Sequence, residues 1–275
     1  MSDAVRDKTE DARQSVFAQM QAHFHASSMG RNLPRLSLAD NRLNLALGGG
    51  VLCRRAHLIT TILSASLASG FSLALVAMML RAKKATGPII WCGPLRGGQS
   101  GQLFGAGLAE MGLRPEQFIF IRDSHPLRRM AACEEALATP GLAAVIHEYG
   151  PLYEKADLWQ KSARRLQLAC ERGSATAFMV GTAGATAGFE SAIHISPATH
   201  QANEGGDSAL DWRPRWHAAI RHARGGYPAQ ANLIWDKAQS AFVTPAKDVP
   251  NANWQDQPYR LDTMSPHHLR WQKSA

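Results

Sequence analysis

From residue 56 onward, the sequence alternates between short apolar runs and longer segments in which apolar residues recur at helical spacing. The apolar runs predict strands near 56–62, 89–93, 117–122, 142–147, 175–181 and 191–196. The segments between them predict helices at 70–84, 101–112, 125–138 and 156–173. Each helix is long enough for a right-handed crossover between parallel strands. The alternation therefore predicts an α/β fold with a three-layer core and a mostly parallel sheet.

The segments on either side of this alternation differ from it and from each other. Residues 2–27 start with mixed charges and continue with apolar residues three or four apart, which predicts an amphipathic helix. Residues 212–243 predict two strands around a Gly-Gly-Tyr-Pro turn. We therefore expect an N-terminal helix and linker at 1–50, a core at 51–200, a C-terminal β-hairpin region at 201–243 and a poorly ordered tail at 244–275.

Length and charge narrow the class of protein. The 275 residues, 45% of them apolar, are enough for one substantial domain, and no uninterrupted apolar run is long enough to span a membrane. The N-terminus is polar where a signal peptide would be apolar, so we expect a cytoplasmic protein with no membrane partner. The net charge of +8 favours a partner with an acidic surface or nucleic acid bound through a basic surface.

Cysteine and histidine spacing gives no metal or catalytic motif. Cys53, Cys92, Cys133 and Cys170 form no C-x-x-C pair, and we interpret them as reduced thiols of the core. The eleven histidines include no H-E-x-x-H motif, and the sequence has no G-x-S-x-G nucleophile elbow. The sequence therefore predicts no metal, no cofactor and no catalytic residue.

Two stretches approach a phosphate-binding loop, and both lack its lysine. Ser69, Gly70, Phe71 and Ser72 are expected to open the helix after the first strand, and residues 93–100 fit G-x-x-x-x-G-K-[ST] except at Gln99. In a working loop, backbone N–H groups hold phosphate and the lysine ammonium reaches the β and γ oxygens. We therefore expect a chain that does not hydrolyse nucleotides.

The acid that would hold magnesium is also unusual. The strand predicted at 142–147 is followed by Glu148 where an aspartate is expected, and Glu148 fits either a magnesium ligand or a solvated loop carboxylate.

Two arginine pairs are candidates for contact with DNA or another anion. Arg164 and Arg165 lie on a predicted helix, where they fit either phosphate contact or an ordinary solvated face. Arg128 and Arg129 lie at the start of another helix, where their charge opposes the helix dipole and favours an external anion.

The chain from about residue 50 to 197 resembles the ImuA family of inducible-mutagenesis proteins, which are similar to RecA and have been grouped with SulA-like proteins. The residues that carry the resemblance are Gly70-Phe71-Ser72-Leu73-Ala74-Leu75, Pro88-Ile89-Ile90-Trp91, Gly107-Leu108-Ala109-Glu110-Met111-Gly112-Leu113, Glu134-Glu135-Ala136-Leu137 and Ala163-Arg164-Arg165-Leu166-Gln167-Leu168-Ala169. In RecA-like cores the phosphate loop follows the first strand, and the acid strand comes after two further strands. By that pattern Ser69 to Ser72 are the vestigial nucleotide loop.

The resemblance implies a RecA-like core and an accessory role in the SOS response, in translesion mutagenesis after DNA damage. The partners it implies are an ImuB-like Y-family protein, RecA and an error-prone polymerase. Trp254, Arg270 and Trp271 are the candidate partner-binding residues of the C-terminal tail, because aromatic and arginine side chains dominate binding hot spots. Homo-oligomerisation through the N-terminal helix stays open.

Two other interpretations stay open. A divergent RecA-like ATPase would use residues 93–100 as its loop and take a lysine such as Lys83 or Lys84 from elsewhere. A SulA-like inhibitor of cell division follows from the grouping of the families.

Overall fold

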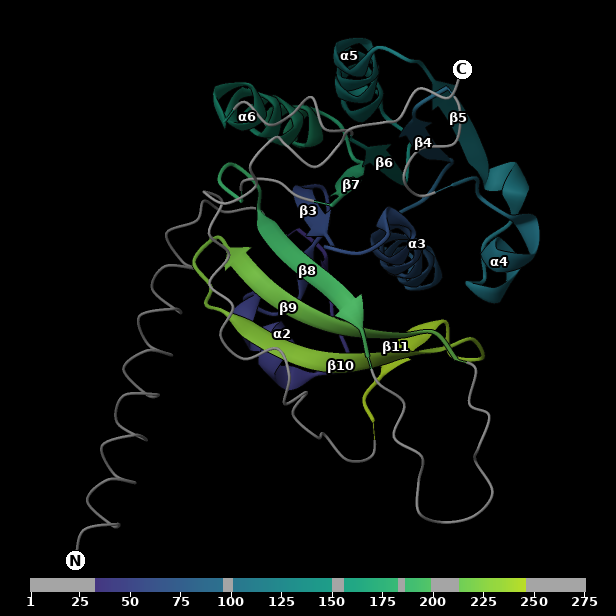
Figure 1. Cartoon of the computed structure of the whole chain (residues 1–275), viewed down its shortest axis with the longest axis vertical. Coiled ribbons are helices and arrows are strands. Elements are labelled where there is room, and N and C mark those ends of the chain that lie inside the picture. Colours follow the sequence, from purple (N-terminus) through teal and green to yellow (C-terminus); the bar gives the residue numbers. More distant parts are fainter. Residues whose placement is uncertain (1–32, 96–100, 150–155, 183–185, 199–212, 246–275) are drawn as a thin grey trace, which may run out of the picture.

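Figure 1 shows the computed structural model of the chain, which describes residues 33–95, 101–149, 156–182, 186–198 and 213–245. The predicted N-terminal helix and most of the predicted C-terminal tail lie outside these residues.

A nine-stranded sheet organises the fold, in the order β11-β10-β9-β8-β3-β7-β6-β4-β5. Six neighbouring strands are parallel, and all of them except the edge strand β5 are largely buried. They are β3 (Ala56–Thr60), β4 (Ile89–Gly93), β5 (Phe118–Arg122), β6 (Ala144–Glu148), β7 (Thr176–Gly181) and β8 (Ser191–Pro197). Each of the six predicted strands is thereby confirmed, and the sheet is mostly parallel.

The C-terminal strands extend this sheet in the antiparallel sense. β9 (Arg215–Ala223) pairs with β8, and β10 (Ala229–Asp236) returns beside β9 after the predicted turn. The sequence missed a third strand, β11 (Ala241–Val243), which pairs with β10 and forms one edge of the sheet.

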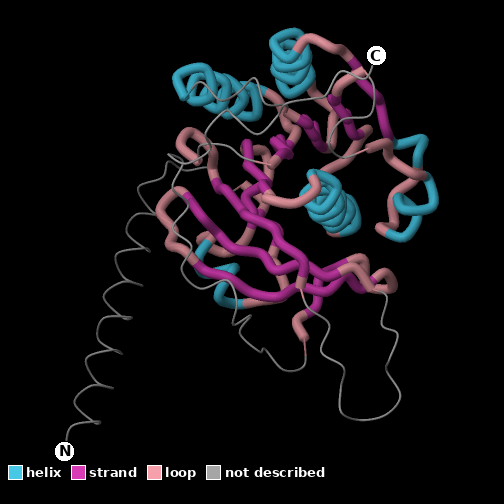
Figure 2. Tube along the Cα trace, in the orientation of Figure 1, coloured by secondary structure: helices cyan, strands magenta, loops and turns pink. Residues whose placement is uncertain are grey.

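Helices cover both faces of the sheet, as the predicted three layers require (Figure 2). α3 (Ala65–Arg81) and the short α4 (Gly105–Glu110) pack on one face, and α5 (Pro126–Ala138) and α6 (Ala156–Arg172) pack on the other. A single 3₁₀ turn, η1 (Pro115–Gln117), leads into β5. Among the described helices, none is long and apolar enough to cross a membrane.

The predicted linker at 28–50 is wrong in its described part, because residues 33–50 contribute to the core. β1 (Arg35–Leu36) pairs with β2 (Val51–Leu52), and α2 (Asn41–Ala46) packs on β9 and β10. The Asp40 carboxylate caps α2 by accepting hydrogen bonds from the backbone N–H groups of Arg42 and Leu43. Six residues are too few to show helical periodicity, so the sequence pattern could not reveal this helix.

Helix α3 is the most enclosed helix of the fold. It carries no charged residue before Arg81, and twelve of its seventeen residues are buried. It contacts β3, β7 and β8 of the sheet and also β1 and β11. The sheet and the C-terminal strands therefore surround this helix, as Figure 1 shows.

The last strand completes the aromatic packing around α3. The Phe242 ring of β11 stacks on Phe71 of α3 with centroids 5.2 Å apart, and it lies edge-on to Trp216 and Trp235 at 5.8 and 5.6 Å. The two indole N–H groups donate to the backbone carbonyls of Leu67 and Glu110. These two tryptophans are thus core residues and cannot act as surface anchors.

We predict that Phe242→Ala destabilises the protein by about 3–5 kcal/mol, because it removes a ring that fills the space between three other rings. Phe104→Ala, at a position where the side chain is 75% exposed, is the matched control and should change the free energy of unfolding by less than about 0.5 kcal/mol. Urea unfolding of both variants measures the difference. Equal effects would contradict the role of β11 in the core.

Candidate functional site

The predicted vestigial loop, Ser69 to Ser72, lies inside a helix. α3 begins at Ala65 with Ser64 as its N-cap, so the prediction that the helix starts at residue 70 is wrong. Only the first four backbone N–H groups of a helix lack a partner within it, and those of Ser69 onward lie beyond them. The backbone of this stretch therefore has no free N–H groups with which to hold phosphate.

Phe71 occupies the position where a phosphate-binding loop would carry its lysine. Its side chain is fully buried, stacked on Phe242 and edge-on to Trp216 at 5.9 Å. Ser69 and Ser72 are buried beside it, and the Ser72 hydroxyl donates to the Ala68 carbonyl of the preceding turn. Residue 71 is therefore a core position inside α3.

The true connection between β3 and α3 consists of Thr61, Ile62, Leu63 and Ser64. It contains no glycine, and the backbone N–H groups of Thr61 and Leu63 donate to the Gly181 carbonyl and the Thr61 hydroxyl. The Ser64 hydroxyl accepts from the N–H group of Ser66. The short connection therefore satisfies donors that a phosphate cradle would have to leave open.

Tyr149 fills the carboxyl edge of the sheet between β3 and β6. A Cβ atom on Gly181, the last residue of β7, would lie 2.4 Å from the Tyr149 ring, so this ring packs directly on the Gly181 backbone. Tyr149 is itself buried and lies edge-on to Trp159 at 4.7 Å. Ligands of parallel α/β sheets bind outside the carboxyl ends of the strands. Here an aromatic cluster covers that place.

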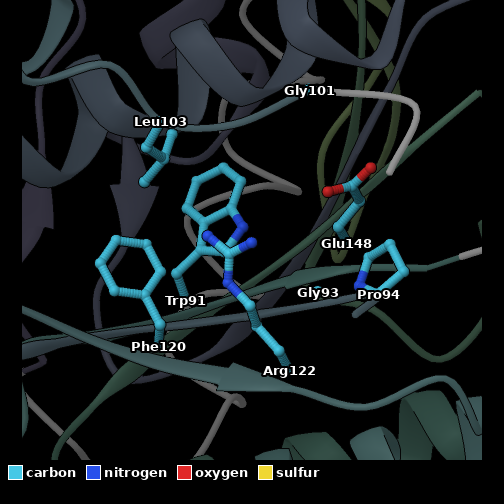
Figure 3. A pocket seen from close by; sticks show the side chains of 8 residues that line it. All are labelled: Trp91, Gly93, Pro94, Gly101, Leu103, Phe120, Arg122 and Glu148. Carbon is cyan, nitrogen blue, oxygen red and sulfur yellow. The ribbon is translucent and has the colours of Figure 1, made fainter. Parts of the chain in front are cut away.

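A pocket remains farther along the same edge, where three neighbouring strands end. Gly93, Arg122 and Glu148 are the last residues of β4, β5 and β6. Figure 3 shows Trp91, Phe120 and Arg122 on one side of the pocket and Glu148 on the other. Pro94, Gly101 and Leu103 complete the lining, so part of the second predicted near-loop borders it.

The pocket combines a carboxylate with a guanidinium. Glu148 is 3% exposed, and its Oε2 atom lies 3.5 Å from the place of a Cβ atom on Gly93, so the carboxylate is in ordinary contact range of Gly93. The Arg122 guanidinium lies over the Phe120 ring, 5.4 Å from its centroid. The cavity volume is about 10 Å³, close to the space that one water molecule needs. As described, the pocket is too small for a nucleoside triphosphate.

Three of the four candidate anion-binding arginines have partners within the protein. Arg128 forms a two-bonded ion pair with Asp123 at 2.8 and 2.9 Å, and this pair lowers the pKa of Asp123 to about 2. The Arg129 side chain is buried and donates to the Asp123 carbonyl at 2.7 Å. Asp123, which precedes the helix, thus supplies the negative charge for which the sequence suggested an external anion.

In the other pair, Arg164 and Arg165, only Arg165 has an ion-pair partner among the described residues. The Arg165 guanidinium lies 2.5 Å from the Glu134 carboxylate and joins α6 to α5, whereas Arg164 is exposed and has no ion pair with any described residue. Ser162, Leu166 and Ala169 are buried, as their helical spacing predicts. Only Arg164 thus keeps the geometry of a candidate phosphate contact.

The pattern of strand ends could have pointed to the pocket. Glu148 was identified from its place after a strand, but Arg122, Trp91 and Phe120 were not, although Arg122 ends its own strand and the two aromatic residues lie two positions before strand ends. The candidate partner-binding residues Trp254, Arg270 and Trp271 lie outside the described residues.

Comparison with known proteins adds no relative. No family model matches this chain, and no curated protein matches it.

We predict that Phe71→Lys destabilises the protein by at least about 4 kcal/mol, because it removes a buried ring and encloses an ammonium group among aromatic rings. Phe71→Leu, which stays apolar, should cost roughly 1–2 kcal/mol. Chemical denaturation measures both. A stable Phe71→Lys protein that binds Mg-ATP would show that residue 71 still borders a nucleotide site.

We predict opposite results for the two neighbouring arginines. Arg129→Ala should lower the free energy of unfolding by about 2–3 kcal/mol, because a buried charged hydrogen bond to the Asp123 carbonyl is lost. Arg128→Ala removes only an exposed pair and should leave the unfolding midpoint unchanged at moderate ionic strength. Loss of DNA binding by Arg129→Ala with no loss of stability would support the original prediction of an anion contact.

Proposed function

We propose that this chain is a non-enzymatic scaffold of RecA-like architecture that acts in DNA-damage-induced translesion mutagenesis, together with an ImuB-like protein and an error-prone polymerase. The observation that carries the proposal is the burial of Phe71, since the residue in the place of the phosphate-binding lysine is part of the core. In this proposal the chain has the strand order of a nucleotide-hydrolysing fold, but it binds partner proteins and not nucleotides.

The order of the strands supports the RecA-like part of the proposal. β3 is the first parallel strand and leads into α3, and β6 follows after two further strands and ends in Glu148. In the sheet β7 lies between β3 and β6, so their carboxyl ends face the same edge. This arrangement agrees with the loop strand and acid strand that the ImuA resemblance implies.

The contacts of the two arginine pairs favour binding to a protein partner over RecA-like binding to DNA. Arg128, Arg129 and Arg165 are held by Asp123 and Glu134, and Arg164 is the one member of the two pairs whose side chain has no ion pair or hydrogen bond with a described residue. Since Trp216 and Trp235 are core residues, Trp254 and Trp271 are the aromatic anchors that the proposal assigns to the partner surface. An ImuB-like protein or RecA is the proposed partner.

A divergent ATPase is the second candidate. It is favoured by one observation, the position of Glu148 beside Gly93 and Pro94, where the second near-loop meets the pocket. Titration with labelled ATP and magnesium separates the two functions. The scaffold predicts no micromolar binding, whereas micromolar binding that Ser100→Ala abolishes would favour the ATPase.

We predict that deletion of residues 244–275 abolishes co-purification with an ImuB-like partner and leaves the unfolding transition of the core intact, because β11 ends at Val243. The control is a deletion from residue 240, which also removes Phe242 and should unfold the core. The measurement is pull-down from damaged cells with identification of partners by mass spectrometry. Undiminished partner recovery by the 1–243 protein would contradict the assignment of the tail as the binding segment.

A further inference from the structure

Cys92, Cys133 and His147 meet in the interior, although they are far apart in the sequence. Their ligand atoms, two sulfurs and an imidazole nitrogen, all lie within 4.8 Å of one another. Cys92 of β4 and His147 of β6 are direct neighbours in the parallel register, and α5, which carries Cys133, packs on both strands. The three residues therefore come from three elements fixed by the sheet and not from a mobile loop.

His147 is not explained as an ordinary core residue. It is 2% exposed, and neither of its ring nitrogens has a hydrogen-bond partner of good geometry in the part of the chain that the structure describes. Buried polar atoms almost always have a partner, and an unsatisfied one indicates a bound ion or water that completes the site. By contrast, both nitrogens of the equally buried His57 have partners, the Ser191 hydroxyl and the Leu52 carbonyl, each at 2.8 Å. An imidazole with a free lone pair beside two sulfurs is a ready metal ligand.

Arg129 also borders Cys92. The Cys92 thiol donates a hydrogen bond to the Arg129 backbone carbonyl, with 3.6 Å between Sγ and the oxygen, and the Arg129 side chain is buried. Cysteine binds metals as the thiolate, so a bound ion would replace this thiol proton.

The dimensions suit a single ion. Cysteine sulfur and histidine nitrogen lie about 2.3 and 2.0–2.1 Å from zinc, so two ligands of one ion are at most about 4.6 Å apart. Atoms within 4.8 Å of one another need only small side-chain adjustments to close around an ion. Two sulfurs and one nitrogen, with no carboxylate among them, select soft thiophilic ions over magnesium or calcium.

We propose that Cys92, Cys133 and His147 form a buried Cys₂His site for a thiophilic d¹⁰ ion, Zn²⁺ or Cu⁺. The ion ties α5 to β4 and β6. Each strand contributes the residue just before its end, so the site lies directly behind Gly93 and Glu148, which face the pocket from the other side of the sheet. Binding displaces the thiol protons of Cys92 and Cys133 to solvent, so no oxidant or reductant takes part.

The test uses the full-length protein, stripped of metal and reduced under anaerobic conditions. Zn²⁺ or Cu⁺ is added against a competing chelator for that ion, and X-ray absorption identifies the bound atoms. We expect one ion per chain, a first shell of two sulfurs and one nitrogen, and a Tm increase of roughly 5–10 °C at about a hundredfold excess over Kd.

Cys92→Ala and Cys133→Ala should each lower the affinity at least a hundredfold, and His147→Phe should remove the nitrogen from the first shell. Cys170→Ala is the matched control, because Cys170 is equally buried and lies outside the trio. Circular dichroism verifies that each variant is folded. If one variant does not fold, the X-ray absorption spectrum of the wild type still tests the proposal. Failure of the reduced wild type to bind either ion, equal loss in Cys170→Ala, or a first shell without two sulfurs overturns the proposal.

Discussion

The burial of helix α3 is the constraint on which the other features of this protein depend. An apolar helix with no charged residue before its last turn is stable in water only if other elements enclose it. The parallel strands provide one wall, and β1 and β11 provide the others. Because Phe71 faces this enclosure, the segment that resembles a phosphate-binding loop is part of the core.

The sequence predicted the repeated part of this fold and missed the short parts. Apolar runs located β3 to β8 because strands buried on both faces are continuous in apolar residues. It missed α2 and β11, which are too short to show a period. It placed the start of α3 at Gly70 because Ser69 to Ser72 resemble a phosphate-binding loop, whereas the helix begins at Ala65.

The candidate sites were predictable to different degrees, for a physical reason. Phe71 was found from a local motif, and Glu148 from its position after a strand. The pair of Arg165 with Glu134 depends on α5 and α6 being neighbours in space, so spacing along the chain could not show it, whereas Asp123 lies only five residues before Arg128. Cys92 and His147 are neighbours only because of the sheet order and register, since β4 and β6 are not consecutive strands. Metal motifs that rest on sequence spacing therefore do not detect ligands that a sheet brings together.

The enclosure of α3 also determines how long this helix stays uncovered while the chain is being synthesised. The hydrogen bond from the Trp216 indole to the Leu67 carbonyl joins residues 149 positions apart, and Phe242 comes later still. At about 5–20 residues per second, the ribosome adds that length on the order of 10 s after α3 has emerged. Throughout that interval the apolar surface of α3 lacks its C-terminal cover. A chain that ends before β11 therefore leaves part of this apolar surface exposed, which favours aggregation.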